Sequence, residues 1–179
     1  HFRNIIMSTL ETNLVQPSTG TTLTLGASGD TITVPSGATL TVTGTLGGTG
    51  VSNVIQTIVS SSEAIGSTSL TDLASATLDI TPTSTSSKIL ILGRIQADIG
   101  DNGFGYAILR DTTNIFETTA GYDVYNNTGN VRTVNTVCYL DSPSSTSQIT
   151  YKYQVKTYDS DNVTFQNAGQ SIITAMELK

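Results

Sequence analysis

A short repeat near the N-terminus constrains the fold of this chain more than any other feature of its sequence. Each unit places a threonine between two aliphatic residues and then continues into a glycine-rich turn. The anchors Leu14, Leu23, Ile32 and Leu40 follow one another at intervals of nine, nine and eight residues. Because side chains alternate across a β-strand, both aliphatic residues of a unit share one face, so the repeat predicts a ladder of short strands. The expected apolar core of this ladder is Leu14, Leu23, Leu25, Ile32, Val34, Leu40 and Val42.

A ladder this thin has too little apolar surface to fold alone. Each unit offers about two aliphatic side chains, whereas ordering one residue costs about 1–2 kcal/mol of backbone entropy. Three copies around a threefold axis would close the apolar faces on each other and remove free strand edges. We therefore expect residues 1–50 to form an N-terminal attachment segment and a trimeric β-helix or β-prism-like stalk, in which residues before Met7 are a leader or tag. A flexible Ser/Thr/Gly linker is the alternative.

The remainder of the chain predicts an antiparallel β-sandwich. Residues 51–62 are expected to be a connector, and residues 63–179 contain short strand-like runs separated by turn clusters about every ten residues, with no long helical pattern. The strongest run, residues 88–97, is expected to be a central strand, and residues 131–140 to be buried on both faces with Cys138 as a core thiol. The sequence therefore predicts an all-β chain that ends in a jelly-roll-like knob, with a hairpin meander closed into a barrel as the competing topology.

Composition removes several classes of function. The chain has 8 basic and 14 acidic residues and a net charge of −6, so a nucleic-acid backbone is not an expected partner. No apolar run approaches the roughly 20 residues that span a bilayer, so membrane insertion is not expected. The chain has one histidine, His1, and one cysteine, Cys138, which removes most histidine- and cysteine-based catalysis and metal binding. We expect no enzymatic activity, no catalytic residue, no metal site and no cofactor.

The candidate binding residues lie in a polar loop at residues 121–129. Aromatic faces beside amide and carboxylate groups suit the recognition of sugars or proteins, and loops on a rigid scaffold commonly carry binding. Residues 159–162 resemble the start of a calcium loop but lack its glycine and its final glutamate, so a solvated turn is expected there. The expected receptor-binding residues are Tyr122, Asp123, Tyr125, Asn126 and Asn127.

Both ends of the chain resemble a known group of proteins. The stretches 7–10 and 22–38 are similar to the opening of small virion fibre proteins of tailed bacteriophages, especially marine and cyanobacterial phages. The stretches 87–92, 139–143 and 171–178 are similar to their C-terminal knob. The resemblance implies a homotrimer whose slender stalk attaches to the particle and whose knob faces outward.

Two functions are compatible with this resemblance. The first is a non-enzymatic virion fibre protein, whose N-terminus docks to other virion proteins and whose knob attaches to a glycan or protein on the host surface. The second is a capsid decoration or head fibre protein, which has a structural role and no obligatory receptor. Both place the chain in the virion as a homotrimer, and they differ in where the N-terminus docks.

Overall fold

The structure is a computed structural model of the whole chain, and it describes residues 31, 33–39, 41, 50–119 and 122–179. The chain divides into two compact units, His1–Leu46 and Gly47–Lys179. In the first unit, the amide of Ala38 donates to the carbonyl of Pro35 across a turn at Ser36 and Gly37, and Val34 is 43% exposed. The other expected stalk residues lie outside the described residues, so the trimeric stalk stays a prediction. They are Leu14, Leu23, Leu25, Ile32, Leu40 and Val42.

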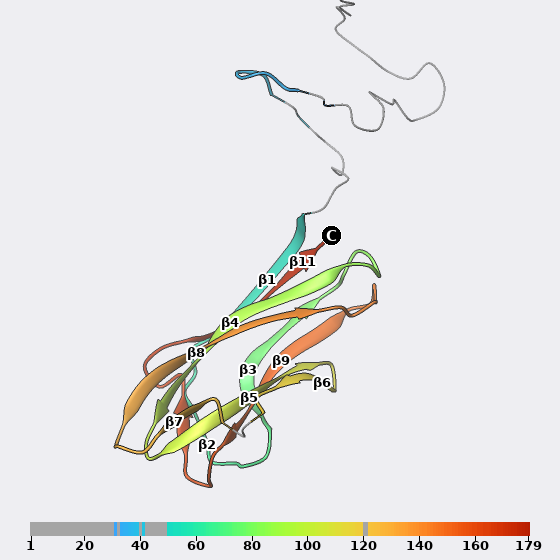
Figure 1. Cartoon of the computed structure of the whole chain (residues 1–179). Coiled ribbons are helices and arrows are strands. Elements are labelled where there is room, and N and C mark those ends of the chain that lie inside the picture. Colours follow the sequence, from blue (N-terminus) through green and yellow to red (C-terminus); the bar gives the residue numbers. More distant parts are fainter. Residues whose placement is uncertain (1–30, 32, 40, 42–49, 120–121) are drawn as a thin grey trace, which may run out of the picture. The chain divides into compact units, whose positions relative to one another are not determined.

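The second unit consists of two antiparallel sheets, as the sequence predicts (Figure 1). The first sheet contains β1 (Val51–Val59), β2 (Glu63–Ile65), β4 (Lys88–Ile99), β8 (Val131–Asp141), β10 (Val163–Phe165) and β11 (Ser171–Leu178). The second sheet contains β3 (Thr71–Ile80), β5 (Asn102–Arg110), β6 (Thr113–Glu117), β7 (Val124–Asn126) and β9 (Ile149–Thr157). The described residues include no helix long and apolar enough to cross a membrane.

Each sheet has four strand positions, because short strands follow one another along the same neighbour. β11 and then β10 pair with one side of β4, while β8 pairs with its other side. β1 and β2 continue the first sheet beyond β11 and β10, and β6 and β7 share one side of β5. The positions therefore run β1/β2, β11/β10, β4, β8 in one sheet and β3, β9, β5, β6/β7 in the other. This order is that of a jelly-roll sandwich and differs from a meander, in which consecutive strands would pair throughout.

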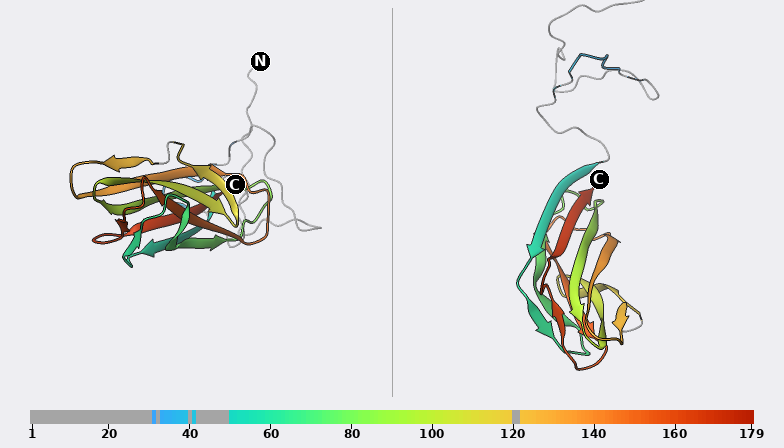
Figure 2. Two further views of the ribbon diagram at one scale, coloured as in Figure 1. Left: turned by 90° about the horizontal axis from the view of Figure 1, so that it is seen from below. Right: turned by 90° about the vertical axis from the view of Figure 1, so that its left-hand side faces the viewer.

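The two sheets pack against each other (Figure 2), and alternating side chains build the core between them. In β9, Tyr151, Tyr153 and Val155 are fully buried, while the residues between them are partly exposed. Phe104 of β5 and Phe165 of β10 meet edge to face across the two sheets, with ring centroids 5.3 Å apart. Burying each of these side chains contributes about 1.5–3 kcal/mol. The apolar core thus depends on the period-two pattern that also predicts the strands.

Two expectations about individual elements are wrong. Residues 51–59 are not a connector, because they form β1 and pair with β11 along their length. β8 is an edge strand rather than a buried one, and Cys138 is exposed rather than a core thiol. β8 carries apolar residues on both faces because its outer face is itself apolar.

The two ends of the sandwich differ in what they carry. The amide of Lys179 donates to the carbonyl of Gly50 at 2.9 Å, so the unit's first strand and the C-terminus meet at one end, which we call the base. The opposite end, which we call the tip, comprises residues 100–101, 122–130 and 158–162 (Figure 1). The expected binding loop therefore lies at the end away from the point where the N-terminal residues join the sandwich.

Candidate functional site

Three tyrosines form a compact cluster at the tip. Tyr122 precedes β7, Tyr125 lies within β7, and Tyr158 follows β9. The ring centroids are 5.2 Å apart for Tyr122 and Tyr125, 5.0 Å for Tyr122 and Tyr158, and 5.1 Å for Tyr125 and Tyr158. Two of the three pairs meet nearly edge to face, the geometry that aromatic quadrupoles favour. Tyr125 and Tyr158 remain 45% and 52% exposed, so the tyrosine cluster offers aromatic surface to solvent.

Backbone pairing with β5 holds this tyrosine cluster together. The amide of Asp123 donates to the carbonyl of Phe104 at 2.7 Å, and the amide of Tyr158 donates to the carbonyl of Gly103 at 2.9 Å. Gly103 pairs with Tyr125, and a Cβ at Gly103 would lie 2.5 Å from a β7 carbonyl oxygen and 3.0 Å from the tyrosine ring. The absence of a side chain at Gly103 therefore allows the Tyr125 ring to lie against β5.

A buried asparagine fixes the segment that carries Tyr158. Asn102 is 1% exposed, and its side chain donates to the carbonyl of Asp161 at 2.6 Å. Its carbonyl oxygen accepts from the amides of Gly103 and Asp159. The β9–β10 loop is thereby tied to the start of β5. Residues 159–161 form bends, and Asp159 and Asp161 are held by these contacts. The described part of the chain contains no group of three or more potential metal-ligating side chains.

The structure places the five expected binding residues together at the tip but gives them different surroundings. Tyr125 and Asn127 are exposed, and Tyr122 is half-buried. Asp123 accepts a hydrogen bond from Asn135 of β8 at 2.6 Å. Asn126 donates to the carbonyls of Gly100 and Gly129, which makes it a support for the loop more than a contact residue. Their role in binding stays a prediction.

Sequence reasoning did not place Tyr158 in this cluster. Tyr158 and Tyr125 lie far apart in the chain, and the pairing of both β7 and β9 with β5 brings them together. The pKa of the Tyr125 phenol is raised, first because its neighbours remove water from it and then because Tyr158 and Asp101 disfavour its anion. The Tyr125 phenol therefore enters any complex near neutral pH as an uncharged hydrogen-bond donor and acceptor.

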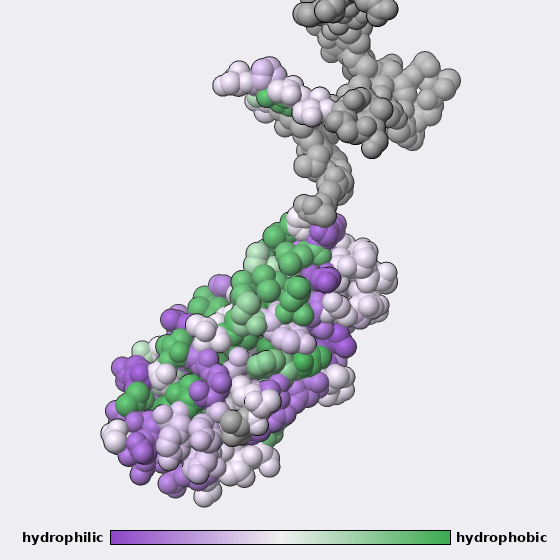
Figure 3. All heavy atoms as spheres, viewed as in Figure 1, coloured by the Kyte–Doolittle hydropathy of each residue, from purple (hydrophilic) through white to green (hydrophobic). Residues whose placement is uncertain are grey.

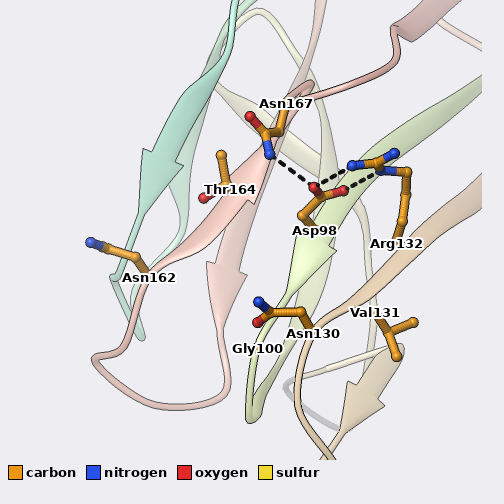
Figure 4. A pocket seen from close by; sticks show the side chains of 8 residues that line it. All are labelled: Asp98, Gly100, Asn130, Val131, Arg132, Asn162, Thr164 and Asn167. Carbon is orange, nitrogen blue, oxygen red and sulfur yellow. Dashed lines mark hydrogen bonds and ion pairs between the residues drawn. The ribbon is translucent and has the colours of Figure 1, made fainter.

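A polar pocket of about 380 Å³ lies on the outer side of the first sheet near the tip (Figure 4). Asp98 of β4 accepts two hydrogen bonds from Arg132 of β8, at 2.8 and 3.0 Å, one from Asn167 at 2.9 Å and one from Gln96 at 2.9 Å. Gly100 lines this pocket and also accepts the bond from Asn126, so the pocket and the tyrosine cluster share a backbone segment.

The charges in the pocket neutralise each other. Hydrogen bonds from Arg132 and then from Asn167 lower the pKa of Asp98 from 3.8 to about 2, so its carboxylate is ionised at neutral pH. Asp98 is the one carboxylate among the lining residues, which are Asp98, Gly100, Asn130, Val131, Arg132, Asn162, Thr164 and Asn167. A second carboxylate would be needed for glycosidase chemistry. The pocket thus offers amide, hydroxyl and guanidinium groups suited to hydrogen bonding rather than to proton transfer.

Comparison with known proteins gives a distant likeness of fold. No family model matches the chain, and no curated protein matches it. Among solved structures, it is similar to the VP2 subviral particle of infectious bursal disease virus, with 13% identity, a TM-score of 0.46, and coverage of 70% of this chain and 32% of that one. It is also similar to the structure of the Gt strain of the same virus, with 12% identity, a TM-score of 0.38, and coverage of 70% and 37%.

This likeness is confined to the arrangement of strands. The chain spans about a third of the length of the solved chains it matches. At these identities no residue role, partner or assembly passes from those proteins to this chain.

Proposed function

We propose that this chain is a non-enzymatic virion fibre protein whose tip attaches to a molecule on the host surface and whose N-terminal residues dock to the particle. The virion assignment rests on the resemblance of residues 7–10, 22–38 and the three knob stretches to phage fibre proteins. The attachment role rests on the tyrosine cluster, which presents aromatic surface at the end of the sandwich away from Gly50 and Lys179.

A surface saccharide is the ligand that best matches this tip. Sugar rings have apolar C–H faces that pack on aromatic rings, and hydroxyl groups that pair with amides and carboxylates. Tyr125 and Tyr158 supply the aromatic faces, and Asn127 with the polar pocket supplies hydrogen-bonding groups close by. The ordered supports beneath the cluster, Asn102 and Asn126, would reduce the entropy lost on binding.

The test uses the full chain with a fluorescent label on arrays of purified bacterial lipopolysaccharides and capsular polysaccharides. We expect saturable binding to some of these glycans, and a loss of about tenfold or more in affinity, about 1.4 kcal/mol, for Tyr125→Ala and Tyr158→Ala. Both side chains are about half exposed, so both variants should keep the fold. Thr113→Ala, an exposed change in β6 away from the tip, is the matched control.

The outcome separates the candidate functions. Glycan binding that both tyrosine variants retain would contradict the proposed site. Binding to bacterial cells without glycan binding would point to a protein receptor instead. A chain that binds neither, while antibodies to it label the heads of intact virions, would favour the capsid decoration alternative.

A further inference from the structure

The outward side of the first sheet is apolar across four neighbouring strands. The pairing register places Val54 of β1, Met176 of β11, Leu90 of β4 and Leu140 of β8 in one row across the sheet. Two rows further along β1 and β11, Ile58 pairs with Ile172. We call the surface made by these six residues the apolar face.

The apolar face is exposed to an unusual degree for aliphatic side chains. Val54 is 53% exposed, Ile58 51% and Leu140 46%, and Val134 of β8 is 46% exposed nearby. Apolar atoms gather along this side of the sandwich (Figure 3). A buried aliphatic side chain removes on the order of 100 Å² from water, so the partly exposed residues here leave on the order of 300 Å² uncovered. The largest apolar patch on a typical monomeric protein is about 300–600 Å² and is often functional.

The polar groups of this surface suit a dry contact. Gln56 lies in the row between Val54 and Ile58, and its amide donates to the hydroxyl of Thr174 at 3.0 Å. The carboxylates of Glu177 and Asp141, on the same strands, are buried and directed into the domain. In these rows no carboxylate faces outward among the described residues of β1, β4, β8 and β11.

We infer that the apolar face is the surface through which copies of this chain associate. The molecule has a net charge of −6, so copies repel each other through most of their surfaces. The apolar face carries no carboxylate, and Arg94 is the charge within its rows. Two copies can therefore meet here without carboxylates of one copy facing carboxylates of the other. The uncovered area of on the order of 300 Å² would form the central apolar part of such an interface, and the polar residues around it would form the rim.

The charge of the face also disfavours other partners. A basic partner would be attracted by carboxylates, and the face has none. An acidic partner would be attracted by cations, and the face has only Arg94 within its rows and Lys88 at the base. A second copy needs neither. The apolar face is separate from the tyrosine cluster, because Leu90 and Leu140 lie towards the base end of β4 and β8 and the cluster lies at the tip.

The test measures the mass of the full chain in solution by light scattering after gel filtration. The perturbation is the double variant Val54→Lys/Leu140→Lys, which places two ammonium groups on the apolar face at positions that are already half exposed. The matched control, Ala74→Lys/Thr113→Lys, adds the same charge at exposed positions of the second sheet. We expect the wild type and the control to be oligomers, about three times 18.8 kDa for a trimer, and the face variant to be a monomer of 18.8 kDa.

Two results would overturn the inference. One is a monomeric wild type. The other is a face variant whose mass equals that of the wild type, because the copies would then associate elsewhere. Should the lysine variant lose its strand signal in circular dichroism, Val54→Thr/Leu140→Thr introduces no charge and decides the question. We expect its dissociation constant to rise at least tenfold, and an unchanged constant would refute the interface.

Discussion

Replacing Glu177 with glutamine should destabilise the sandwich in a way that depends on pH. Glu177 of β11 is 0% exposed, and its Oε1 accepts hydrogen bonds from the Thr83 amide at 2.7 Å, the Thr83 hydroxyl at 2.7 Å and the Ser87 hydroxyl at 2.6 Å. These bonds hold the β3–β4 loop against the end of β11. Burial opposes the charge, but the hydrogen bonds from Ser87 and Thr83 outweigh it and lower the pKa of Glu177 from 4.5 to about 2.

The magnitude follows from the charge on these bonds. A hydrogen bond to a charged group contributes about 1.5–3 kcal/mol and a neutral one about 0.5–1.5 kcal/mol, a difference of about 1 kcal/mol for each of the three bonds. Because burial of the charge offsets part of this sum, Glu177→Gln should cost about 2–3 kcal/mol at neutral pH. The fall in pKa from 4.5 to about 2 corresponds to about 3 kcal/mol of folding free energy, which agrees. Because the folded pKa is the lower one, this stabilisation is complete above pH 4.5 and is lost as the pH falls towards 2.

The assay is urea denaturation of the wild type and Glu177→Gln at pH 7 and at pH 2.5. We expect the difference in unfolding free energy to be about 2–3 kcal/mol at pH 7 and to shrink by more than half at pH 2.5. Other carboxylates titrate equally in both proteins and cancel in the difference. An equal stability at pH 7, or the same gap at both pH values, would refute the role assigned to the charge of Glu177.

Three further perturbations test the fold and its tip. Gly93→Ala, in the centre of β4, should cost at least about 3 kcal/mol in thermal unfolding, because its Cβ would lie 2.0 Å from a β11 carbonyl oxygen. Gly100→Ala should be nearly neutral, because the nearest atom to its Cβ would lie at 3.5 Å. Equal effects of the two variants would contradict the close packing of β4 against β11. Tyr151→Phe removes a buried hydrogen bond of 2.6 Å to Asp141 and should lower the urea midpoint by an amount equal to about 1–2 kcal/mol; an unchanged midpoint would show that this bond contributes nothing. Asn126→Ala should leave global stability within about 1 kcal/mol but change the near-ultraviolet circular dichroism of the tyrosine cluster, and an unaltered spectrum would count against its supporting role.

Strands with one solvent-exposed face could be predicted from the sequence, because their apolar and polar residues alternate for one reason, the burial of a single face against the core. In β9, the apolar residues Tyr151, Tyr153 and Val155 recur at every second position and all are buried. β4 was expected to be central from its unbroken aliphatic run, and it is paired on both sides. Strand identity and the all-β class were therefore confirmed where the pattern reflects burial against one core.

Strands with two apolar faces were misjudged for a physical reason. Period-two alternation cannot distinguish a residue that faces the domain core from one that faces outward on an apolar surface. Leu140 and Val134 of β8 are apolar yet half exposed, and so are Val54 and Ile58 of β1, the segment expected to be a connector. Apolar residues of β8 that the sequence pattern predicts to be buried therefore belong to the exposed outer surface instead.

The candidate site could be predicted in part. The loop with Tyr122 and Tyr125 was identified from its residue types, and it lies at the tip. Tyr158 was missed as its partner because only the register of β7 and β9 on β5 brings these residues together. Asn102 gave no local signal, because a buried asparagine that braces a loop has the same sequence appearance as one in a solvated turn.

The reactivity of the one cysteine tests most directly whether the apolar face is covered by other copies. Cys138 lies on the outward side of β8, in the row that contains Gln56, and it is exposed in the single chain. We predict that a maleimide reacts with Cys138 slowly in the full-length wild type and rapidly in Val54→Lys/Leu140→Lys. A thiol placed at the tip by Asn127→Cys in a Cys138→Ser background should react rapidly in both. A wild-type Cys138 that reacts as fast as this tip thiol would contradict the account.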